Sequence, residues 1–192
     1  MTRSARCVAP GAPIVDIRAA DPADYDAVRG LLAAAYAPYA AALPPDVYAR
    51  YQRDLADVEG RARTGLVLVA KAGDELVGTA TYYPDAGRGG MGWPAGCAAV
   101  RAVAVSPACS SRGIGRQLMR RCEQLARAAG AHSLCLHTAQ FMTAATALYS
   151  RLGYVRAPQD DFDVTHVYAL DGQPPLIVFG YRLDLHRTEK SA

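Results

Sequence analysis

The stretch CAAVRAVAVSPACSSRGIGRQLMRRCEQLARAAG, residues 97–130, determines the fold that we predict for this chain. Small and β-branched residues fill 98–105, as in a strand that is buried on both faces. Pro107 cannot donate to a ladder and therefore ends the strand. Residues 114–129 then repeat apolar side chains every three or four positions, which indicates an amphipathic helix. Gly130 follows as the residue that ends this helix.

The turn between this strand and this helix has the features of an anion site. Gly113 and Gly115 leave the backbone bare where the helix begins, and the first N–H groups of a helix have no internal partner. Arg112 and Arg116 add positive charge beside them. An ordinary helix start with a flexible glycine turn would look the same, so both interpretations stay open. A P-loop and a dinucleotide-binding motif are excluded, since no lysine follows the glycines and Leu118 replaces the third glycine.

Length and composition favour one globular domain. The chain has 192 residues, 51% hydrophobic residues and a formal net charge of +3. A chain of this length can bury a core, and its mild charge, without a Lys/Arg run, argues against a nucleic-acid-binding protein. Residues 1–13 lack the apolar segment of a signal peptide, and no run approaches the roughly 20 apolar residues of a membrane span. We therefore expect a soluble, cytoplasmic protein that binds neither nucleic acid nor membrane.

The cysteines do not form a pattern typical of a metal site or of a disulfide framework. There are five of them, an odd number, and none stands in a C-x-x-C pair. Buried free thiols in a reducing compartment explain them best. We also expect no metal site.

The whole chain predicts an α/β fold with a mixed sheet and helices on both faces. We expect a disordered tail at 1–13, a single domain at 14–187 and a second tail at 188–192. The predicted strands are 14–18, 66–71, 76–83, 98–105, 133–138, 154–156 and 176–185. The predicted helices are 21–36, 46–62, 114–129 and 142–152. A hairpin turn at 72–74 and long loops at 84–96 and 157–175 connect them. A ligand is expected at the carboxyl ends of the parallel strands.

Two motifs in this element order resemble the GNAT acyltransferase family, the acetyl-CoA-dependent N-acetyltransferases. The first is V-R-A-V-A-V-S-P at 100–107 followed by R-G-I-G at 112–115. The second is M-x-x-A-x-x-L-Y-x-x-L-G-Y at 142–154. The resemblance covers about 14–185. It implies a GNAT-like acyl-CoA N-acyltransferase fold with about six to seven strands in a mixed central sheet flanked by helices, and acetyl-CoA (coenzyme A) as the cofactor.

The resemblance also implies a role for each matched segment. The central strand would pair with the pantetheine arm and carry a bulge, whose free N–H would bind the thioester carbonyl as an oxyanion donor. The turn would hold the pyrophosphate. Tyr149 would protonate the departing thiolate, although an aromatic residue of the core would have the same spacing. The implied cofactor-binding residues are Val103, Ala104, Val105, Ser110, Ser111, Arg112, Gly113, Ile114, Gly115, Arg116, Met142, Ala145 and Tyr149.

Three positions depart from the family pattern. Ser110 stands where Gln or Arg is usual, and Met142 stands where Asn is frequent. Ala99 occupies the place of a glutamate that serves as the base in some members. The general base therefore does not follow from the resemblance.

His137 is a candidate for that base, because it lies near the end of the neighbouring strand and imidazole has a pKa near 6.5. A buried core histidine with a backbone partner would fit the same position. Tyr82, Tyr83, Asp85 and a chain of water molecules are further candidates.

The acceptor side is less clearly specified. Tyr36, Tyr39, Tyr82 and Trp93 are candidate substrate-binding residues, and the loop at 157–175 adds carboxylates at Asp160, Asp161 and Asp163. An aromatic wall with carboxylates would suit a cationic amine. A solvated acidic loop with ordinary packing explains the same residues.

We therefore predict an N-acetyltransferase that moves the acetyl group of acetyl-CoA to a primary amine by direct attack. Its catalytic residues would be Tyr149, as the general acid, and His137. The acceptor would be a small-molecule or peptide amine. A covalent route through Cys109 is less attractive, because this cysteine lies in the phosphate turn. The alternative is a catalytically degenerate acyl-CoA-binding sensor or scaffold, suggested by Ala99, Ser110 and Met142. A homodimer is a further expectation, since many members of the family dimerise.

Overall fold

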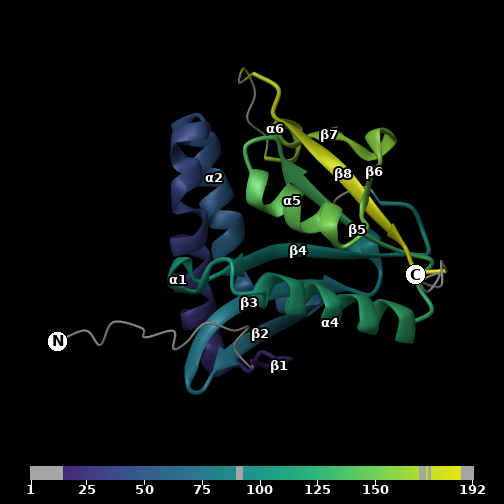
Figure 1. The fold of residues 1–192 in the computed structure, drawn as a ribbon. Helices are drawn as coiled ribbons and strands as arrows, with labels where there is room; N and C mark the ends of the chain where they lie inside the picture. Colours follow the sequence, from purple (N-terminus) through teal and green to yellow (C-terminus); the bar gives the residue numbers. More distant parts are fainter. Residues whose placement is uncertain (1–14, 90–92, 169–171, 173, 187–192) are drawn as a thin grey trace.

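The computed structural model of this chain describes residues 15–89, 93–168, 172 and 174–186 (Figure 1). The predicted tails at 1–13 and 188–192, and the first residue of the predicted first strand, lie outside the described residues. The strands are β1 Asp16–Ala19, β2 Leu66–Ala72, β3 Glu75–Tyr83, β4 Cys97–Val105, β5 Ser133–Ala139, β6 Val155–Arg156, β7 Phe162–Asp163 and β8 Ile177–Asp184. The helices are α1 Tyr25–Tyr36, α2 Pro45–Ala56, α3 Val58–Thr64, α4 Ile114–Ala128, α5 Thr143–Arg151 and α6 Val164–Val167.

The strands form one mixed sheet in the order β1-β2-β3-β4-β5-β8-β6, with β7 paired to β8 beside this path. Seven strands lie on the path, as predicted, and β7 adds a two-residue strand. Every strand pair is antiparallel except β4–β5. The predicted hairpin turn is present between β2 and β3, where Gly73 adopts a φ of +61° that suits glycine. The α/β fold class is therefore confirmed.

Two connections differ from the prediction. The single helix predicted over 46–62 is two helices, because Asp57 leaves helical geometry at φ −77°, ψ +67° and its carboxylate accepts a hydrogen bond from the Gly60 N–H at 2.8 Å. An aspartate at this position starts a new helix. The loop predicted over 157–175 contains β7 and α6. Asp163 organises it by accepting hydrogen bonds from the N–H groups of Thr165 and Leu176, both at 3.0 Å.

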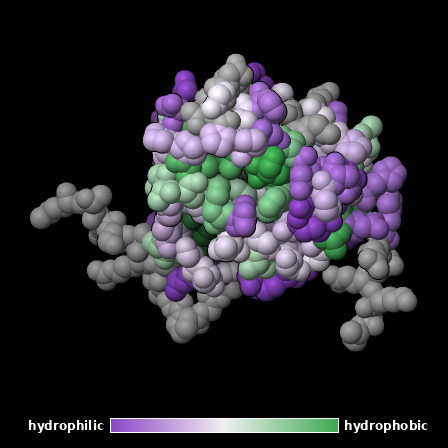
Figure 2. Space-filling view, turned by 90° about the horizontal axis from the view of Figure 1, so that it is seen from above, coloured by the Kyte–Doolittle hydropathy of each residue, from purple (hydrophilic) through white to green (hydrophobic). Residues whose placement is uncertain are grey.

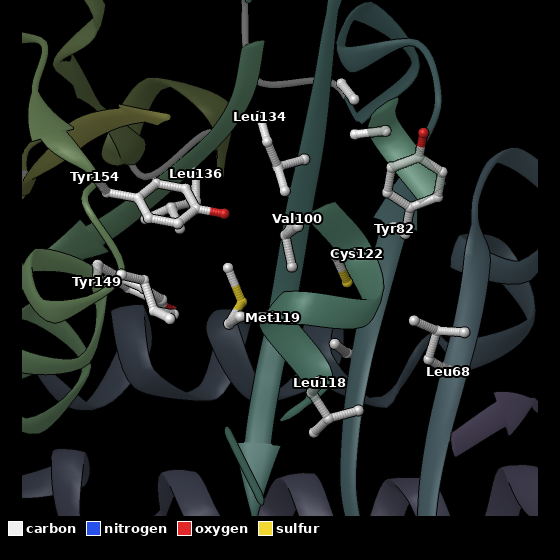
Figure 3. Close-up of a cluster of buried hydrophobic side chains, with 14 of the residues drawn as sticks. Leu68, Tyr82, Val100, Leu118, Met119, Cys122, Leu134, Leu136, Tyr149 and Tyr154 are labelled. Carbon is white, nitrogen blue, oxygen red and sulfur yellow. The ribbon is translucent and has the colours of Figure 1, made fainter. Parts of the chain in front are cut away.

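Alternating side chains of the sheet build two cores, one on each face. On β2, Leu68 and Ala70 lie in the cluster under α4, while Val67 and Val69 lie in the cluster under α1. Figure 3 shows the first cluster, in which Leu118, Met119 and Cys122 of α4 lie among side chains of the sheet. Figure 1 shows α4 along the sheet, with α1 and α2 beside it on the other face. This arrangement supports the central strands β3 and β4 from both sides.

The cysteines follow the prediction in part. Cys97, Cys122 and Cys135 are buried free thiols, as expected. The expectation is wrong for Cys109, which is disulfide-bonded. No helix within the described ranges is long and apolar enough to cross a bilayer.

The start of α4 packs directly on β3 at Gly78. A Cβ added there would lie 2.9 Å from Ile114 Cγ2 and 3.0 Å from Leu118 Cδ1. Both of these side chains are almost completely buried. The missing side chain of Gly78 therefore sets how closely α4 approaches the sheet.

We expect Gly78→Val to lower the free energy of unfolding by about 1–3 kcal/mol, because overpacking a core displaces its neighbours. Urea unfolding followed by circular dichroism would measure the change. The matched control is Gly30→Ala in α1, where an added Cβ meets nothing within 4 Å. That variant should gain about 0.5–1 kcal/mol from helix propensity. Equal stability of the Gly78→Val variant and the wild type would show that α4 is not in tight contact with β3.

Candidate functional site

The separation of β4 from β5 opens a large cavity in the described chain. These parallel neighbours pair only over Cys97–Ala99 and Ser133–Cys135. Each of the two strands stays paired with its neighbour on the other side. β4 pairs with β3 as far as Val105, and β5 pairs with β8 as far as Ala139. The sheet therefore divides beyond Ala99, and a cavity of about 1010 Å³ lies at the division. Figure 2 shows the molecule from above the view of Figure 1, with apolar side chains in green largely surrounded by hydrophilic ones in purple.

A bulge in β4 places irregular backbone in this cavity. The register passes from Thr79–Ala104 to Thr81–Arg101, so two residues of β4 stand opposite one residue of β3. Ala102, inside the bulge, has a φ of +51°, which is uncommon for a residue other than glycine. The hydroxyl of Tyr36 donates a hydrogen bond to the Val103 carbonyl at 3.1 Å and ties α1 to the bulge. The structure thus contains the bulge that the family resemblance implies.

The turn after β4 forms the second wall of the cavity. Ser111 has a φ of +62°, and Gly113 has a φ of +80° as the residue that caps α4. A Cβ on Gly115 would lie 3.2 Å from Leu148 Cδ2 of α5, so this glycine lets α5 approach the start of α4. The backbone of the turn is therefore bare toward the cavity and lies at the N-terminus of a 15-residue helix. Such a terminus attracts phosphate.

All of the predicted cofactor residues line this one cavity. Their side chains differ in character, since Ile114 is a core residue while Ser110, Ser111 and Arg116 are exposed. The residues of the prediction that line the cavity are Val103, Ala104, Val105, Ser110, Ser111, Arg112, Gly113, Ile114, Gly115, Arg116, Met142, Ala145 and Tyr149.

Tyr149 lines the cavity and belongs to the core at the same time. Its side chain is buried in the cluster under α4, with its ring 5.8 Å from that of Tyr154 and 6.5 Å from that of Tyr181 (Figure 3). Burial raises the pKa of the Tyr149 hydroxyl well above its usual range. The phenol therefore keeps its proton at neutral pH and can act only as a donor of that proton.

His137 lines the cavity between two aromatic rings. It stacks on Trp93 at 4.2 Å and meets the edge of Phe162 at 4.7 Å. Its Nε2 lies 2.7 Å from the carbonyl oxygen of Asp160, so this nitrogen carries the proton. Burial lowers the pKa of His137 to about 4. His137 therefore has the backbone partner of a structural histidine and is neutral at pH 7.

The three carboxylates of the acidic loop do not line the cavity. Asp160 accepts hydrogen bonds from Arg182 at 2.7 Å, Asp161 accepts from Arg156 at 2.8 Å, and Asp163 caps α6. None of the three lines the cavity. The interpretation of these carboxylates as an acceptor site is therefore wrong, because each of them has a structural partner.

The other sequence candidates divide in the same way. Tyr36, Tyr39 and Trp93 line the cavity, whereas Tyr82 lies in the core under α4 and does not line it. Asp85, which was a candidate base, also lies outside the cavity and accepts a hydrogen bond from the N–H of Gly87 at 3.1 Å. Ala99 and Tyr83 lie in the small buried cluster around Trp93, and neither lines the cavity.

The sequence analysis did not assign several polar and aromatic residues that line the cavity. Among them are Tyr51, Asp54, Arg101, Phe141 and Tyr168. Tyr51 and Asp54 share one face of α2, three residues apart, and that spacing was a detectable signal. Tyr168 follows α6, which was predicted as loop, and Arg101 lies within an otherwise apolar strand.

The comparison with protein families identifies the family of this chain. A model of the acetyltransferase (GNAT) family matches residues 27–154, which contain the bulged strand, the glycine turn and α5. Among the curated proteins, none matches this chain in sequence.

Solved structures share the fold at low sequence identity. The paia N-acetyltransferase from Thermoplasma acidophilum, in complex with coenzyme A, superposes with a TM-score of 0.66 at 15% identity over 89% of this chain and 99% of that one. The Salmonella typhimurium protein yncA, with its cofactor acetyl-CoA, superposes with a TM-score of 0.61 at 22% identity. The match covers 91% of this chain and 96% of that one. A GNAT family acetyltransferase from Brucella melitensis, in complex with acetyl-CoA, superposes with a TM-score of 0.55 at 26% identity. The match covers 74% of this chain and 83% of that one.

The lowered pKa of His137 predicts a pH-dependent loss of stability. Between pH 6.5 and about 4 the unfolded chain binds a proton at this residue and the folded chain does not, so stability falls as the pH falls. From pH 7.5 to 5 this contribution amounts to about 2 kcal/mol. Urea unfolding at pH 7.5 and pH 5 measures the free energy of unfolding. Between these pH values it should fall by about 2 kcal/mol more in the wild type than in His137→Gln. Because all other groups are shared, an identical pH dependence in the two proteins would contradict the neutral, buried imidazole.

Proposed function

The chain belongs to the GNAT acetyltransferase family, and we propose that it transfers the acetyl group of acetyl-CoA to a primary amine by direct attack on the thioester. One observation supports this most strongly. The bulged strand, the bare glycine turn and the buried Tyr149 all face the same cavity of about 1010 Å³. Together they supply a place for the thioester, a place for phosphate and a proton donor.

The residues present fit coenzyme A. The turn at 110–116 offers bare backbone at a helix N-terminus with Arg112 and Arg116 beside it, which suits a pyrophosphate. Residues 100–105 of β4 have no ladder partner on the β5 side, which suits the amide groups of a pantetheine arm. Met142 offers the arm an apolar contact and no side-chain hydrogen bond. When bound, acetyl-CoA supplies an activated acyl group on a thiol leaving group.

The bulge supplies the electrostatic part of the proposed mechanism. As the amine attacks, negative charge develops on the thioester oxygen. A backbone N–H at the bulge is a fixed donor for that charge, and a donor that is already in place needs no rearrangement during the reaction. The hydrogen bond from Tyr36 to Val103 holds the bulged backbone in position.

Tyr149 supplies the proton for the departing sulfur in this proposal. Its buried hydroxyl stays protonated at neutral pH, as a proton donor must. His137 is the candidate for receiving the proton that the amine loses. It is neutral at pH 7 and its Nδ1 can accept, but a pKa of about 4 makes it a carrier toward water rather than a final acceptor.

The proposed cofactor site predicts an effect of Gly113→Glu on thermal stabilisation by acetyl-CoA. Ligand at about 100 times its dissociation constant stabilises a protein by about 2.7 kcal/mol, which raises the Tm of a domain of this size by roughly 5–10 °C. The wild type should show this rise and Gly113→Glu should not, because its carboxylate repels the pyrophosphate. Differential scanning fluorimetry measures both.

The control for this experiment is Gly113→Gln. It has a side chain of the same length at the same positive φ but carries no charge, so it should retain a substantial part of the rise. An equal rise in all three proteins would place the cofactor elsewhere. Binding without release of free CoA for any amine would instead favour the sensor.

The proposed role of Tyr149 predicts the effect of removing its hydroxyl. Tyr149→Phe should lower kcat by roughly 10²- to 10⁴-fold, as expected for a general acid, while acetyl-CoA binding measured by calorimetry changes little. The matched control is Tyr154→Phe, since the buried Tyr154 hydroxyl has no hydrogen-bond partner in the described chain and does not line the cavity. Similar rates for Tyr149→Phe and the wild type would remove Tyr149 from the chemistry.

A further inference from the structure

Beyond the bulge, five side chains that line the cavity form a continuous series of contacts, which we call the circuit. They are Tyr36, Tyr51, Tyr168, Asp54 and Arg101. The Tyr36 hydroxyl bonds the Val103 carbonyl at 3.1 Å, and the Tyr36 ring meets the Tyr51 ring edge-on at 5.6 Å. Tyr51 lies 6.4 Å from Tyr168, whose hydroxyl donates to Asp54 Oδ2 at 3.4 Å. Arg101 donates to the same oxygen at 3.0 Å, and Arg101 directly precedes the bulge. The circuit thus starts and ends at the place where the thioester would be held.

The aromatic part of this circuit is an extended, uncharged wall. Tyr39 continues it from Tyr36 at 5.8 Å, and Phe141 follows Tyr39 at 5.4 Å. Burial raises the pKa of Tyr36 to about 12 and raises those of Tyr51 and Tyr168 well above the usual range, so the hydroxyls stay neutral at pH 7. Rings arranged edge-on and tilted can accept another aromatic ring among them.

Asp54 is the carboxylate in the circuit. Its side chain is 29% exposed and that of Arg101 is 24% exposed, so the pair lies at the cavity surface without being sealed from it. The hydrogen bonds that Asp54 accepts from Arg101 and Tyr168 both go to its Oδ2 atom. A carboxylate accepts at about four positions, so Asp54 has capacity for the N–H groups of an amine.

The cationic groups near Asp54 have partners of their own. Arg101 is paired with Asp54, and Arg61 donates to the carbonyl oxygens of Asp54 at 2.6 Å and Leu55 at 2.7 Å, at the end of α2. Arg50 lies over the Tyr168 ring at 5.2 Å. One donor, Nε of Arg61, is buried without a hydrogen-bond partner in the described chain. The site therefore offers an amine the carboxylate of Asp54, while the guanidinium groups of Arg101, Arg61 and Arg50 each contact a protein partner.

From this circuit we propose that the acceptor is an arylalkylamine, a primary amine on a short chain that ends in an aromatic ring and carries no carboxylate. This inference rests on the proposed acetyl transfer. Asp54 binds the amino group beside the bulge, and the tyrosine wall holds the ring.

The reaction on such an acceptor balances without a further reactant. The bound ammonium first gives one proton to water. Its nitrogen lone pair then forms the C–N bond with the acetyl carbon, while the electron pair of the C–S bond leaves with the sulfur. A second N–H proton is lost from nitrogen as Tyr149 gives its proton to sulfur, and it restores the Tyr149 hydroxyl by way of water. The products are the N-acetyl amine, CoA thiol and one proton.

A panel of matched amines tests the substrate class through the release of free CoA. We expect phenethylamine to exceed n-butylamine in kcat/KM by about 10-fold or more, because a buried ring adds apolar contact. Phenylalanine differs from phenethylamine only by a carboxylate and should be at least about 10-fold poorer, because this charge is repelled by Asp54. A preference for phenylalanine would overturn the proposal and assign Arg61 and Arg101 to a substrate carboxylate. A preference for butylamine or for a peptide N-terminus would overturn it as well.

Variants test the role of Asp54. Asp54→Asn should lower kcat/KM for phenethylamine by about 10- to 100-fold, mainly through KM, as expected for a lost hydrogen bond to a charged group. The matched control is Asp46→Asn, an exposed carboxylate at the start of the same helix, which should leave KM unchanged. Since Asp54→Asn also leaves Arg101 without its ion pair, Tm and acetyl-CoA affinity are measured for each variant. Tyr51→Leu is the second variant, and it should reduce the preference for phenethylamine over butylamine.

The outcomes separate the two proposals. If acetyl-CoA binds and CoA is released with other amines only, the arylalkylamine assignment fails and the acetyl transfer stands. If no amine in the panel gives CoA release, both fail. If Asp54→Asn retains its fold, its acetyl-CoA affinity and its KM for phenethylamine, Asp54 does not bind the amine.

Discussion

The division of the sheet between β4 and β5 is the constraint on which the rest of the structure depends. Three residue pairs join the two strands. Beyond Ala99, β4 stays paired with β3 and β5 stays paired with β8. The bulge around Ala102 lies in the diverging part of β4 and bends the strand. In a regular parallel sheet, the groups at 100–105 would be used in a ladder with β5. Here the same groups line a cavity, so the feature that weakens the sheet also creates the site.

The two hydrophobic clusters, one on each face of the sheet, hold its two halves together across this division. The cluster under α4 includes Val100 from β4 and Leu136 from β5, and thereby bridges the gap from one face. The cluster under α1 includes Ala104 and Ala139, the far ends of the same strands. α5 and its N-cap residue connect the two clusters, since Tyr149 of α5 belongs to the first cluster and the N-cap Met142 to the second. Its position is therefore set by packing, which is a suitable basis for a side chain that must be precisely placed.

Sequence reasoning located the part of the site that local pattern encodes. The strand, the turn at 110–116 and α5 each have a periodicity or a glycine signal, and all three proved to face one cavity. The acceptor end was not accessible in this way. Tyr51 and Asp54 share one face of α2, but nothing in the sequence pairs this face with Tyr168, which contacts both residues from the position just after α6. The carboxylates that stood out by clustering, Asp160 and Asp161, instead form ion pairs with Arg182 and Arg156.

Burial of titratable groups connects the fold to the chemistry. The same desolvation that keeps Tyr149 and Tyr36 protonated keeps His137 neutral, because a partly closed, apolar cavity disfavours every charged form. Desolvation likewise disfavours the charged form of an amine that enters this cavity, whereas the carboxylate of Asp54 favours that form. In the proposed function, desolvation of the amine reduces the need for a strong base, which is consistent with Ala99 at the position where some family members have a glutamate. Among the described residues that line the cavity, Asp54 is the only carboxylate, and hydrogen bonds from Arg101 and Tyr168 fix its position.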